Sequence, residues 1–470
     1  MSSLSAALGL FFLTLFPWAS CLRASEISES PTVIDGKLAN GFRYVILPHV
    51  GRVNGVSVRF LVQAGSLDER EAECGDAHLL EHLAVSSVMA SLSKDSGYAF
   101  GLSAFTHFSF TRYMIDLNPD QVRITPEALQ RFRHICDGLT FTKDQINANK
   151  RVVRQEFHST STLAQRVYLE RLAVSYEGTG IPERLPKGLL DRIDDATPTR
   201  VRNFHLRCYQ PDRMALVVVG KVDPSEVIQL VEKTFGSLRN TESGAAAVLP
   251  RPVPPTPLRS RVIVVRGQDY AEVTLFAIPP LAIRIDATKQ RESEFAEAVI
   301  AQVLGRRLAM YAATENLGAT RSQRSDPPDP HFREYSFSIK AAPNQWPSLA
   351  TYLATEVRRL CTENIPANEL EDAVAAQLAA WRAKREEFQR RPANMIADEM
   401  VTEIVAGTRC IVPARRFSEA EDYLALLTPT DARIVAQTLF NEEALSLILT
   451  VPTTEIEAGA LLTAYRQGAP

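Results

Sequence analysis

The stretch on which the interpretation of this chain rests is Gly75-Asp-Ala-His-Leu-Leu-Glu-His82. His78 and His82 are four residues apart, so on an α-helix both imidazoles lie on one face, with Glu81 beside them. Two converging imidazoles form half of a zinc site, and an adjacent carboxylate that is not a ligand can take a proton from water at the metal. The pattern H-x-x-E-H is the inverted form of the H-E-x-x-H zinc motif. The alternative is two ordinary histidines on a helix, but the 470 residues contain only 8 histidines, so a chance match is rare.

A catalytic zinc site needs a third protein ligand and one open position. One long helix is predicted over residues 143–173, because Val152, Val153 and Phe157 recur at helical spacing. Glu156 lies on the polar flank of this pattern. From the residues alone, Glu156 is either the third ligand or an ordinary solvated glutamate.

The segments around the motif indicate an α+β fold. Strands are predicted at residues 42–47, 56–62 and 107–117, and helices at residues 77–90 and 126–138. Apolar residues alternate along the second and third strands, so each strand buries one face. We therefore expect a mainly antiparallel sheet covered by helices.

The chain also contains an internal duplication. Thr197-Pro-Thr199 recurs as Thr428-Pro-Thr430, a shift in numbering of 428 − 197 = 231, and the strand at 214–219 recurs at 445–450 with the same shift. A repeat of this length indicates two related domains. The second half has one histidine, His331, so it cannot repeat a two-histidine site. The predicted divisions are a zinc-binding domain at 25–240, a proline-rich linker at 241–258 and a related domain without the metal site at 259–470.

Residues 1–24 are expected to form a signal peptide, because the apolar run at 7–18 precedes the small residues Ala19-Ser20-Cys21. An uncleaved membrane anchor is the rival interpretation, since the n-region has no lysine or arginine. We expect export to the periplasm or the medium. Six scattered cysteines do not make a disulfide scaffold, and a net charge of −3 gives no case for nucleic acid.

With these residues in view, the chain resembles the insulinase/pitrilysin family of inverted zinc metallopeptidases, and most of all its short members of the processing-peptidase type. The resemblance is dense over Leu38-Ala-Asn-Gly-Phe-Arg-Tyr, Gln63-Ala-Gly-Ser-Leu-Asp-Glu and the metal motif, and continues in Tyr209-Gln-Pro211 and Val218-Val-Gly-Lys-Val-Asp223. It implies one zinc per chain, with His78 and His82 as ligands and Glu81 as the general base. It also implies Glu156 as the third ligand, 156 − 82 = 74 positions beyond the second histidine.

Three departures from the family pattern affect substrate handling. Asn149 stands where another acid is usual, and Ser103-Ala104 replaces the usual Asn-Ala. Thr314 and Arg321 stand where the second half of family members supplies an arginine and a tyrosine. These changes bear on catalytic efficiency and substrate range, and they leave the metal motif intact.

The expected function is zinc-dependent endopeptidase activity on extended peptides or unfolded polypeptides, which would pair with a strand edge at Ser103, Ala104 and Thr106. The alternative is a non-catalytic peptide-binding or assembly subunit that keeps a structural zinc. The resemblance also implies a dimer, either with itself or with a related subunit that lacks the histidines.

Overall fold

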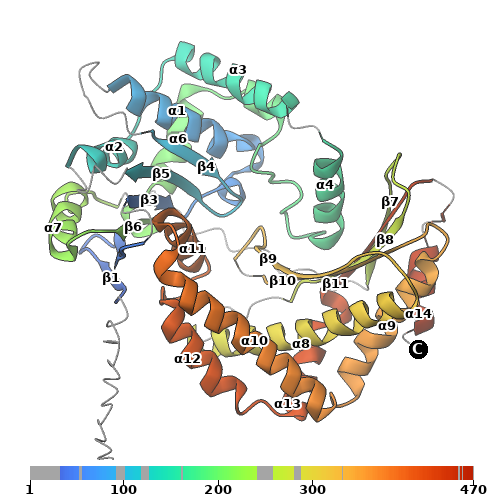
Figure 1. The fold of residues 1–470 in the computed structure, drawn as a ribbon. Helices are drawn as coiled ribbons and strands as arrows, with labels where there is room; N and C mark the ends of the chain where they lie inside the picture. The colour runs from blue at the N-terminus through green and yellow to red at the C-terminus, as the bar shows by residue number, and fades with distance from the viewer. Residues whose placement is uncertain are drawn as a thin grey trace, which may run out of the picture. The chain divides into compact units, whose positions relative to one another are not determined.

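Two β-sheets, one in each half of the chain, organise the fold (Figure 1). The computed structural model describes residues 32–468 except for 52–54, 92–100, 118–125, 160–161, 241–257, 280–286, 331, 454–455 and 458. The expected signal peptide and nearly all of the expected linker lie outside the described residues.

The first sheet has six strands in the order β1-β2-β6-β3-β5-β4. Their bounds are β1 Ile34–Lys37, β2 Arg43–Pro48, β3 Val56–Val62, β4 Ser103–Thr106, β5 Thr111–Leu117 and β6 Met214–Gly220. Every pair is antiparallel except β2 with β6. All residues of β3 and β6 are buried, so these strands form the centre of the sheet.

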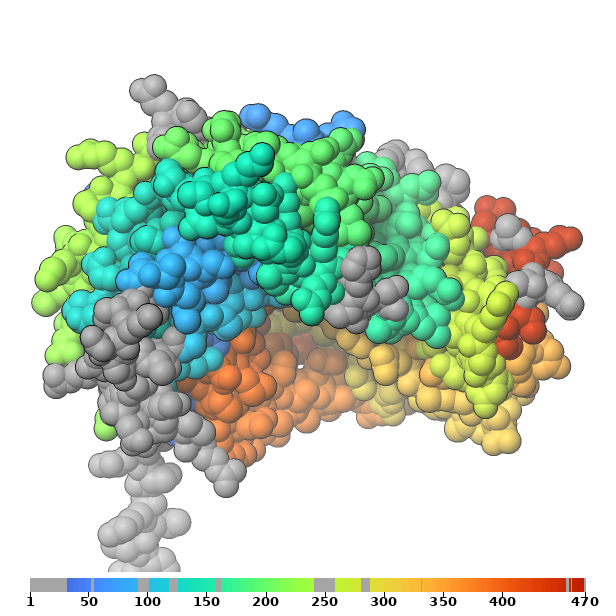
Figure 2. All heavy atoms as spheres, turned by 90° about the horizontal axis from the view of Figure 1, so that it is seen from above, coloured from blue at the N-terminus to red at the C-terminus, as the bar shows by residue number. Residues whose placement is uncertain are grey.

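Helices cover one face of this sheet around Phe60, whose ring lies 5.4 Å from Phe132 and 6.1 Å from Phe235. The helices of the first half are α1 Asp76–Ser91, α2 Pro126–Cys136, α3 Lys143–Ser159, α4 Leu163–Ser175, α5 Leu190–Asp194, α6 Pro198–Cys208 and α7 Pro224–Phe235. Residues of α1, α2, α6 and α7 share one apolar core with the strands. Helices α1 and α3 lie side by side (Figure 1), on the surface that faces the viewer in Figure 2.

The second sheet has five strands in the order β7-β11-β8-β10-β9, and only β7 with β11 is parallel. Its strands are β7 Arg259–Val264, β8 Ala271–Ala277, β9 Thr320–Ser325, β10 Glu334–Ala341 and β11 Leu445–Val451. The helices are α8 Ala287–Thr314, α9 Trp346–Thr362, α10 Ala367–Glu387, α11 Ala393–Val405, α12 Pro413–Leu424, α13 Pro429–Leu439 and α14 Ala460–Gly468. The predicted α+β class, with two related sheets covered by helices, is confirmed.

The duplication read from the sequence is present in the structure. The starts of α6 and α13 differ in numbering by 429 − 198 = 231, and the starts of β6 and β11 differ by 445 − 214 = 231. Both helices are capped in the same way, because the hydroxyls of Thr197 and Thr428 accept a hydrogen bond from a backbone amide of the first turn. Each half thus repeats one helix–strand unit, and the strand of that unit lies inside its sheet with a neighbour on either side.

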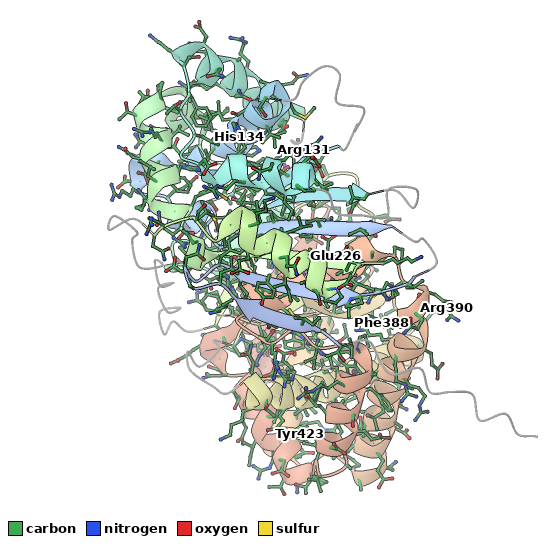
Figure 3. The ribbon with its side chains drawn as sticks, turned by 90° about the vertical axis from the view of Figure 1, so that its left-hand side faces the viewer. Arg131, His134, Glu226, Phe388, Arg390 and Tyr423 are labelled. Carbon is green, nitrogen blue, oxygen red and sulfur yellow. The ribbon has the colours of Figure 1, made fainter. Side chains whose placement is uncertain are left out.

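One face of each sheet packs against helices of its own half. The opposite face is contacted by one helix of the other half. Ile396 and Met400 of α11 pack on the first sheet, together with Phe388, which is labelled in Figure 3. On the second sheet, Val167 of α4 packs against Ile263 and Ile448. This exchange joins the two halves in one compact unit that runs from Pro31 to Pro470.

Ion pairs with at least one buried partner reinforce this exchange. Arg59 of β3 is 2% exposed and contacts Asp116 at 2.7 Å and Asp398 of α11 at 2.7 Å. From the other direction, Arg171 of α4 contacts Glu334 of β10 at 2.7 Å. A buried arginine needs such partners because an unpaired buried charge is costly.

Two sequence-based element boundaries are wrong. The single helix predicted over residues 143–173 is two helices, α3 and α4, and Thr162 caps the second by accepting a hydrogen bond from the Gln165 amide. The strand predicted at 107–117 begins only at Thr111, because the His107 amide donates to the Phe110 carbonyl in a turn. Among the described residues, no helix has the length and apolar character needed to cross a bilayer.

Candidate metal centre

The start of α1 is fixed by three buried contacts, and these set the position of the motif. Gly75 has φ 105°, and a Cβ there would lie 2.5 Å from Ile193, so glycine is required. Glu69 accepts a hydrogen bond from the Ala77 amide at 2.8 Å. Asp76 forms two hydrogen bonds of 2.8 Å with Arg200 of α6. These contacts fix the first turn of α1, which carries His78, against residue Glu69 and against helix α6.

The three predicted ligands converge. The Nε2 atoms of His78 and His82 lie 3.2 Å apart, and Glu156 of α3 places its Oε2 3.4 Å and 3.5 Å from them. Four-coordinate zinc with ligand distances of about 2.0–2.1 Å requires ligand atoms ~3.3 Å apart, which matches these three separations. Among the described residues, no other three histidine, cysteine or acidic side chains converge in this way, with their ligand atoms within 4.8 Å of one another. The donor set therefore fits zinc.

The electrostatic setting favours metal binding. Burial, together with the neighbouring His82 and Lys187, lowers the pKa of His78 to about 3. The imidazole is consequently neutral near pH 7, which is the form that ligates a metal. The Glu156 side chain is 44% exposed, against 12% for His78 and 18% for His82, so the centre is open to solvent on the Glu156 side.

Glu81 lies one residue before His82 and is 8% exposed. Its Oε2 accepts a hydrogen bond of 2.7 Å from the Thr106 hydroxyl at the end of β4. Burial raises the pKa of Glu81, and the hydrogen bond from Thr106 opposes that rise. A carboxylate held in place, with its pKa moved towards neutrality, is suited to accept and return a proton.

These groups line one cavity of about 650 Å³. It contains His78, Glu81, His82 and Glu156, and its other walls are mainly apolar. Those walls include Phe105, Phe108, Phe157, Tyr168, Leu169 and Leu185. The sequence reasoning missed them as site residues, because they come from separate segments with no common spacing. The cavity can hold an apolar side chain beside the metal centre.

The predicted substrate strand, β4, is the last strand of the first sheet as described. Ser103 and Phe105 are exposed and Ala104 is half-buried, whereas Thr106 is buried and directed at Glu81. The backbone of this edge is thus close to the metal centre. Pairing with a peptide there stays a prediction.

The departures from the family pattern lie outside the ligand set. Asn149 is buried and accepts a hydrogen bond of 3.1 Å from Ser86 of α1, so it joins α3 to the metal helix. Thr314 ends α8 and Arg321 lies on β9, and neither lines the metal cavity. Glu170, the next acidic residue along the chain after Glu156, lies on α4 and contacts Arg261 at 3.5 Å. It does not belong to the converging group.

The duplicated sheet-and-helix architecture and the His-x-x-Glu-His helix define the class of inverted zinc-peptidase folds. More particularly, the chain belongs to the insulinase family, peptidase family M16: residues 44–181 match that family, and residues 195–377 match the Peptidase M16 inactive domain. The resemblance read from the motifs is confirmed. The second match accords with a second half that has no pair of histidines.

Relatives include the probable zinc protease PqqL of Escherichia coli, 23% identical over 411 residues, which are 84% of this chain and 44% of that protein. The stromal processing peptidase of Oryza sativa subsp. japonica is 29% identical over 219 residues, 45% of this chain and 17% of that protein. The chain spans less than half the length of these relatives.

Solved structures share the fold. The crystal structure of the periplasmic protease PqqL from Escherichia coli has a TM-score of 0.81 and 21% identity, over 93% of this chain and 50% of that chain. A protease from Helicobacter pylori has a TM-score of 0.67 and 20% identity, over 90% of this chain and all of that one.

Proposed function

We propose that this chain is a zinc-dependent endopeptidase that hydrolyses extended peptides or unfolded polypeptides. The observation that carries the proposal is the convergence of His78, His82 and Glu156, whose ligand atoms lie within 4.8 Å of one another, beside the buried Glu81. A site with a purely structural metal has no use for a positioned base. Relatives named as zinc proteases support the same interpretation.

Zinc bound by these three residues would polarise the scissile carbonyl and bring the pKa of its water to about 7. Glu81 would accept a proton from the attacking water on a carboxylate oxygen. Thr106 keeps the carboxylate in place through its hydrogen bond of 2.7 Å. Glu81 afterwards returns the proton to the leaving amine, so one residue serves as base and then as acid.

The substrate would bind as an added strand along β4, at Ser103, Ala104 and the backbone of Thr106. Such pairing orients a peptide bond through main-chain hydrogen bonds, with little demand on sequence. The apolar cavity would take a side chain next to the scissile bond. Zinc analysis of the purified chain, combined with cleavage of a mixed peptide library, tests the proposal. One zinc per chain and peptide cleavage are the expected results.

A second candidate is a non-catalytic peptide-binding or assembly subunit with a structural zinc. The observation that favours it is that Thr314 and Arg321 stand at the positions of the expected arginine and tyrosine. This candidate predicts a zinc-loaded chain without peptidase activity under any condition. The intact Glu81 favours the enzyme.

The chain is also proposed to pair with a second copy or with a related subunit, as its resemblance to the short, processing-peptidase-type members implies, and its described residues hold one candidate metal centre. Light scattering should show a dimer, and an active monomer at working concentration would contradict this. We also propose that residues 1–24 direct export of the chain. The two proposed domains comprise residues 25–240 and 259–470. A periplasmic relative supports that location.

A further inference from the structure

The second half contains a cavity of about 450 Å³ in which charged residues gather. It is formed by α8, β9, the end of α10, α11 and the segment 406–416. Five cationic side chains line it: Arg291, Arg324, Lys384, Arg391 and Arg416. Nothing in the chemistry of the metal centre uses this cavity.

The strand registers show that this cavity is the duplicate of the metal cavity. Phe60 pairs with Leu216 on one side and Tyr113 on the other, and Tyr113 pairs with Ala104. In the second sheet, Leu275 pairs with Leu447 and Phe337, and Phe337 pairs with Ser322. Because Leu447 is the counterpart of Leu216 (447 − 216 = 231), Ser322 is the counterpart of Ala104. Two residues further on, Arg324 is the counterpart of Thr106.

The helices repeat the same relationship. Thr106 donates to Glu81 of α1 at 2.7 Å, and Arg324 donates to Glu294 of α8 at 3.3 Å. Arg291 precedes Glu294 by three residues, as His78 precedes Glu81. Arg291 is therefore the counterpart of His78, the first of the proposed zinc ligands.

The covering helices agree with this assignment. Gln165, Tyr168 and Leu169 of α4 line the metal cavity. The residues 231 positions later, Ile396, Glu399 and Met400 of α11, line the second cavity. The duplication has thus preserved the cavity without the ligand set: Arg291 stands at the position of His78, and Phe295 at that of His82.

Four acidic side chains, Glu294, Asp326, Glu399 and Glu403, also line this cavity and pair with some of its cations, yet individual hydrogen-bond donors are left over. Arg291 is 5% exposed and contacts Glu419 at 2.7 Å, yet its Nη1 atom is buried without an acceptor among the described residues. The Nε atom of Arg416 is likewise buried without an acceptor among the described residues, while its Nη2 atom contacts Glu403. Buried donors of this kind favour an acceptor ligand.

Lys384 completes the group. Its ammonium lies 4.4 Å from the centre of the Trp381 ring. Glu399, the acid whose charge acts on Lys384, is paired with Arg391 at 2.6 Å. Burial of its ammonium group lowers the pKa of Lys384, and the negative charge of Glu399 opposes this decrease. The like charges of Arg416, Arg391 and Arg324 lower the pKa further. A bound anion would relieve this repulsion.

We propose that this cavity binds a small oxyanion, as phosphate or as a carboxylate, between Arg291, Lys384 and Arg416. Guanidinium and ammonium groups recognise such oxygens through charge-assisted hydrogen bonds. The site is independent of the metal centre, so it holds whether or not the chain is a peptidase.

Equilibrium dialysis of the full chain against radiolabelled phosphate tests this, with sodium chloride held at constant ionic strength and unlabelled succinate as a competing carboxylate. Lys384→Gln should weaken phosphate binding about tenfold, the loss expected for one hydrogen bond to a charged group. Although its ammonium group lies against Trp381 and is partly desolvated there, Lys384 as a residue is exposed, so the substitution should not disturb folding. The matched control is Arg382→Gln on the same helix, which removes the same charge outside the cavity and should bind like the wild type.

Saturable binding that Lys384→Gln weakens supports the proposal, and competition by succinate extends it to carboxylates. Absence of saturable phosphate binding would overturn it, as would equal binding by wild type and Lys384→Gln. Zinc content, measured in every sample, should be the same throughout.

Discussion

The hydroxyl of Thr106 donates a hydrogen bond of 2.7 Å to the Oε2 atom of Glu81. Through it, the last strand of the first sheet holds the proposed base of the metal helix. The strand proposed to bind substrate and the carboxylate proposed to move the proton are thus one unit. A substrate strand added to β4 would be positioned relative to Glu81 as well as to the metal ligands.

Thr106→Val should therefore impair turnover without removing the metal. Valine keeps the shape of threonine but cannot donate, so Glu81 loses its orienting partner. We expect about a tenfold lower kcat, which corresponds to roughly 1.4 kcal/mol, with zinc content unchanged. Steady-state cleavage of an unstructured peptide measures this. Thr111→Val is the control, because its hydroxyl donates to the Ala64 carbonyl and not to Glu81. Equal losses in the two variants would refute the orienting role.

The third ligand is tested by a pair of glutamates on neighbouring helices. Glu156→Gln should lower zinc content and activity together, since one of three ligands loses its charge. Glu170→Gln should keep both, because Glu170 contacts Arg261 instead of the histidines. Zinc per chain, by atomic absorption after dialysis, is the measurement. Full zinc in Glu156→Gln would show that the third ligand is misassigned.

The exchange of helices between the halves predicts a stability effect at Asp398. Asp398→Asn removes the negative charge that faces Arg59 and Arg112, at 2.7 Å and 2.8 Å. Asp398 is 40% exposed and Arg59 keeps Asp116, so the loss should be only about 1–2 kcal/mol in unfolding free energy. Urea denaturation measures it, with the exposed Asp422→Asn as control. No difference from the control would mean that this contact contributes nothing to joining the halves.

The sequence predicted the metal helix closely, because the H-x-x-E-H spacing and the apolar residues of α1 point to the same element. The spacing between His82 and Glu156 became informative only through the family resemblance, since a polar helix residue has no local signature of metal binding. The break between α3 and α4 was missed although Ser159-Thr-Ser-Thr162 carries a capping signal, because the apolar pattern continues on both sides of it.

Other features had no signal in the linear sequence. The packing of α11 on the first sheet depends on contacts such as Arg59 with Asp398, which are 339 residues apart. The correspondence between the charged cavity of the second half and the metal cavity depends on the strand registers, which place Arg324 at the position of Thr106. The duplication was readable at its most regular segment, α6 to β6, where no insertion changes the shift in numbering between the halves.

Glu81→Gln distinguishes a zinc peptidase in which Glu81 is the base from a chain that keeps zinc only for structure. Glutamine preserves the size of the side chain and an oxygen to accept the hydrogen bond from Thr106, but it cannot take the proton from water. Glu81 is not part of the ligand group, so zinc should stay bound at one per chain. The measurement is turnover of an unstructured peptide by wild type and Glu81→Gln, with zinc determined in both samples. Turnover should be at least ~10²-fold slower in the variant. Equal rates in two zinc-loaded samples would contradict it, and so would a zinc-loaded wild type that cleaves no peptide.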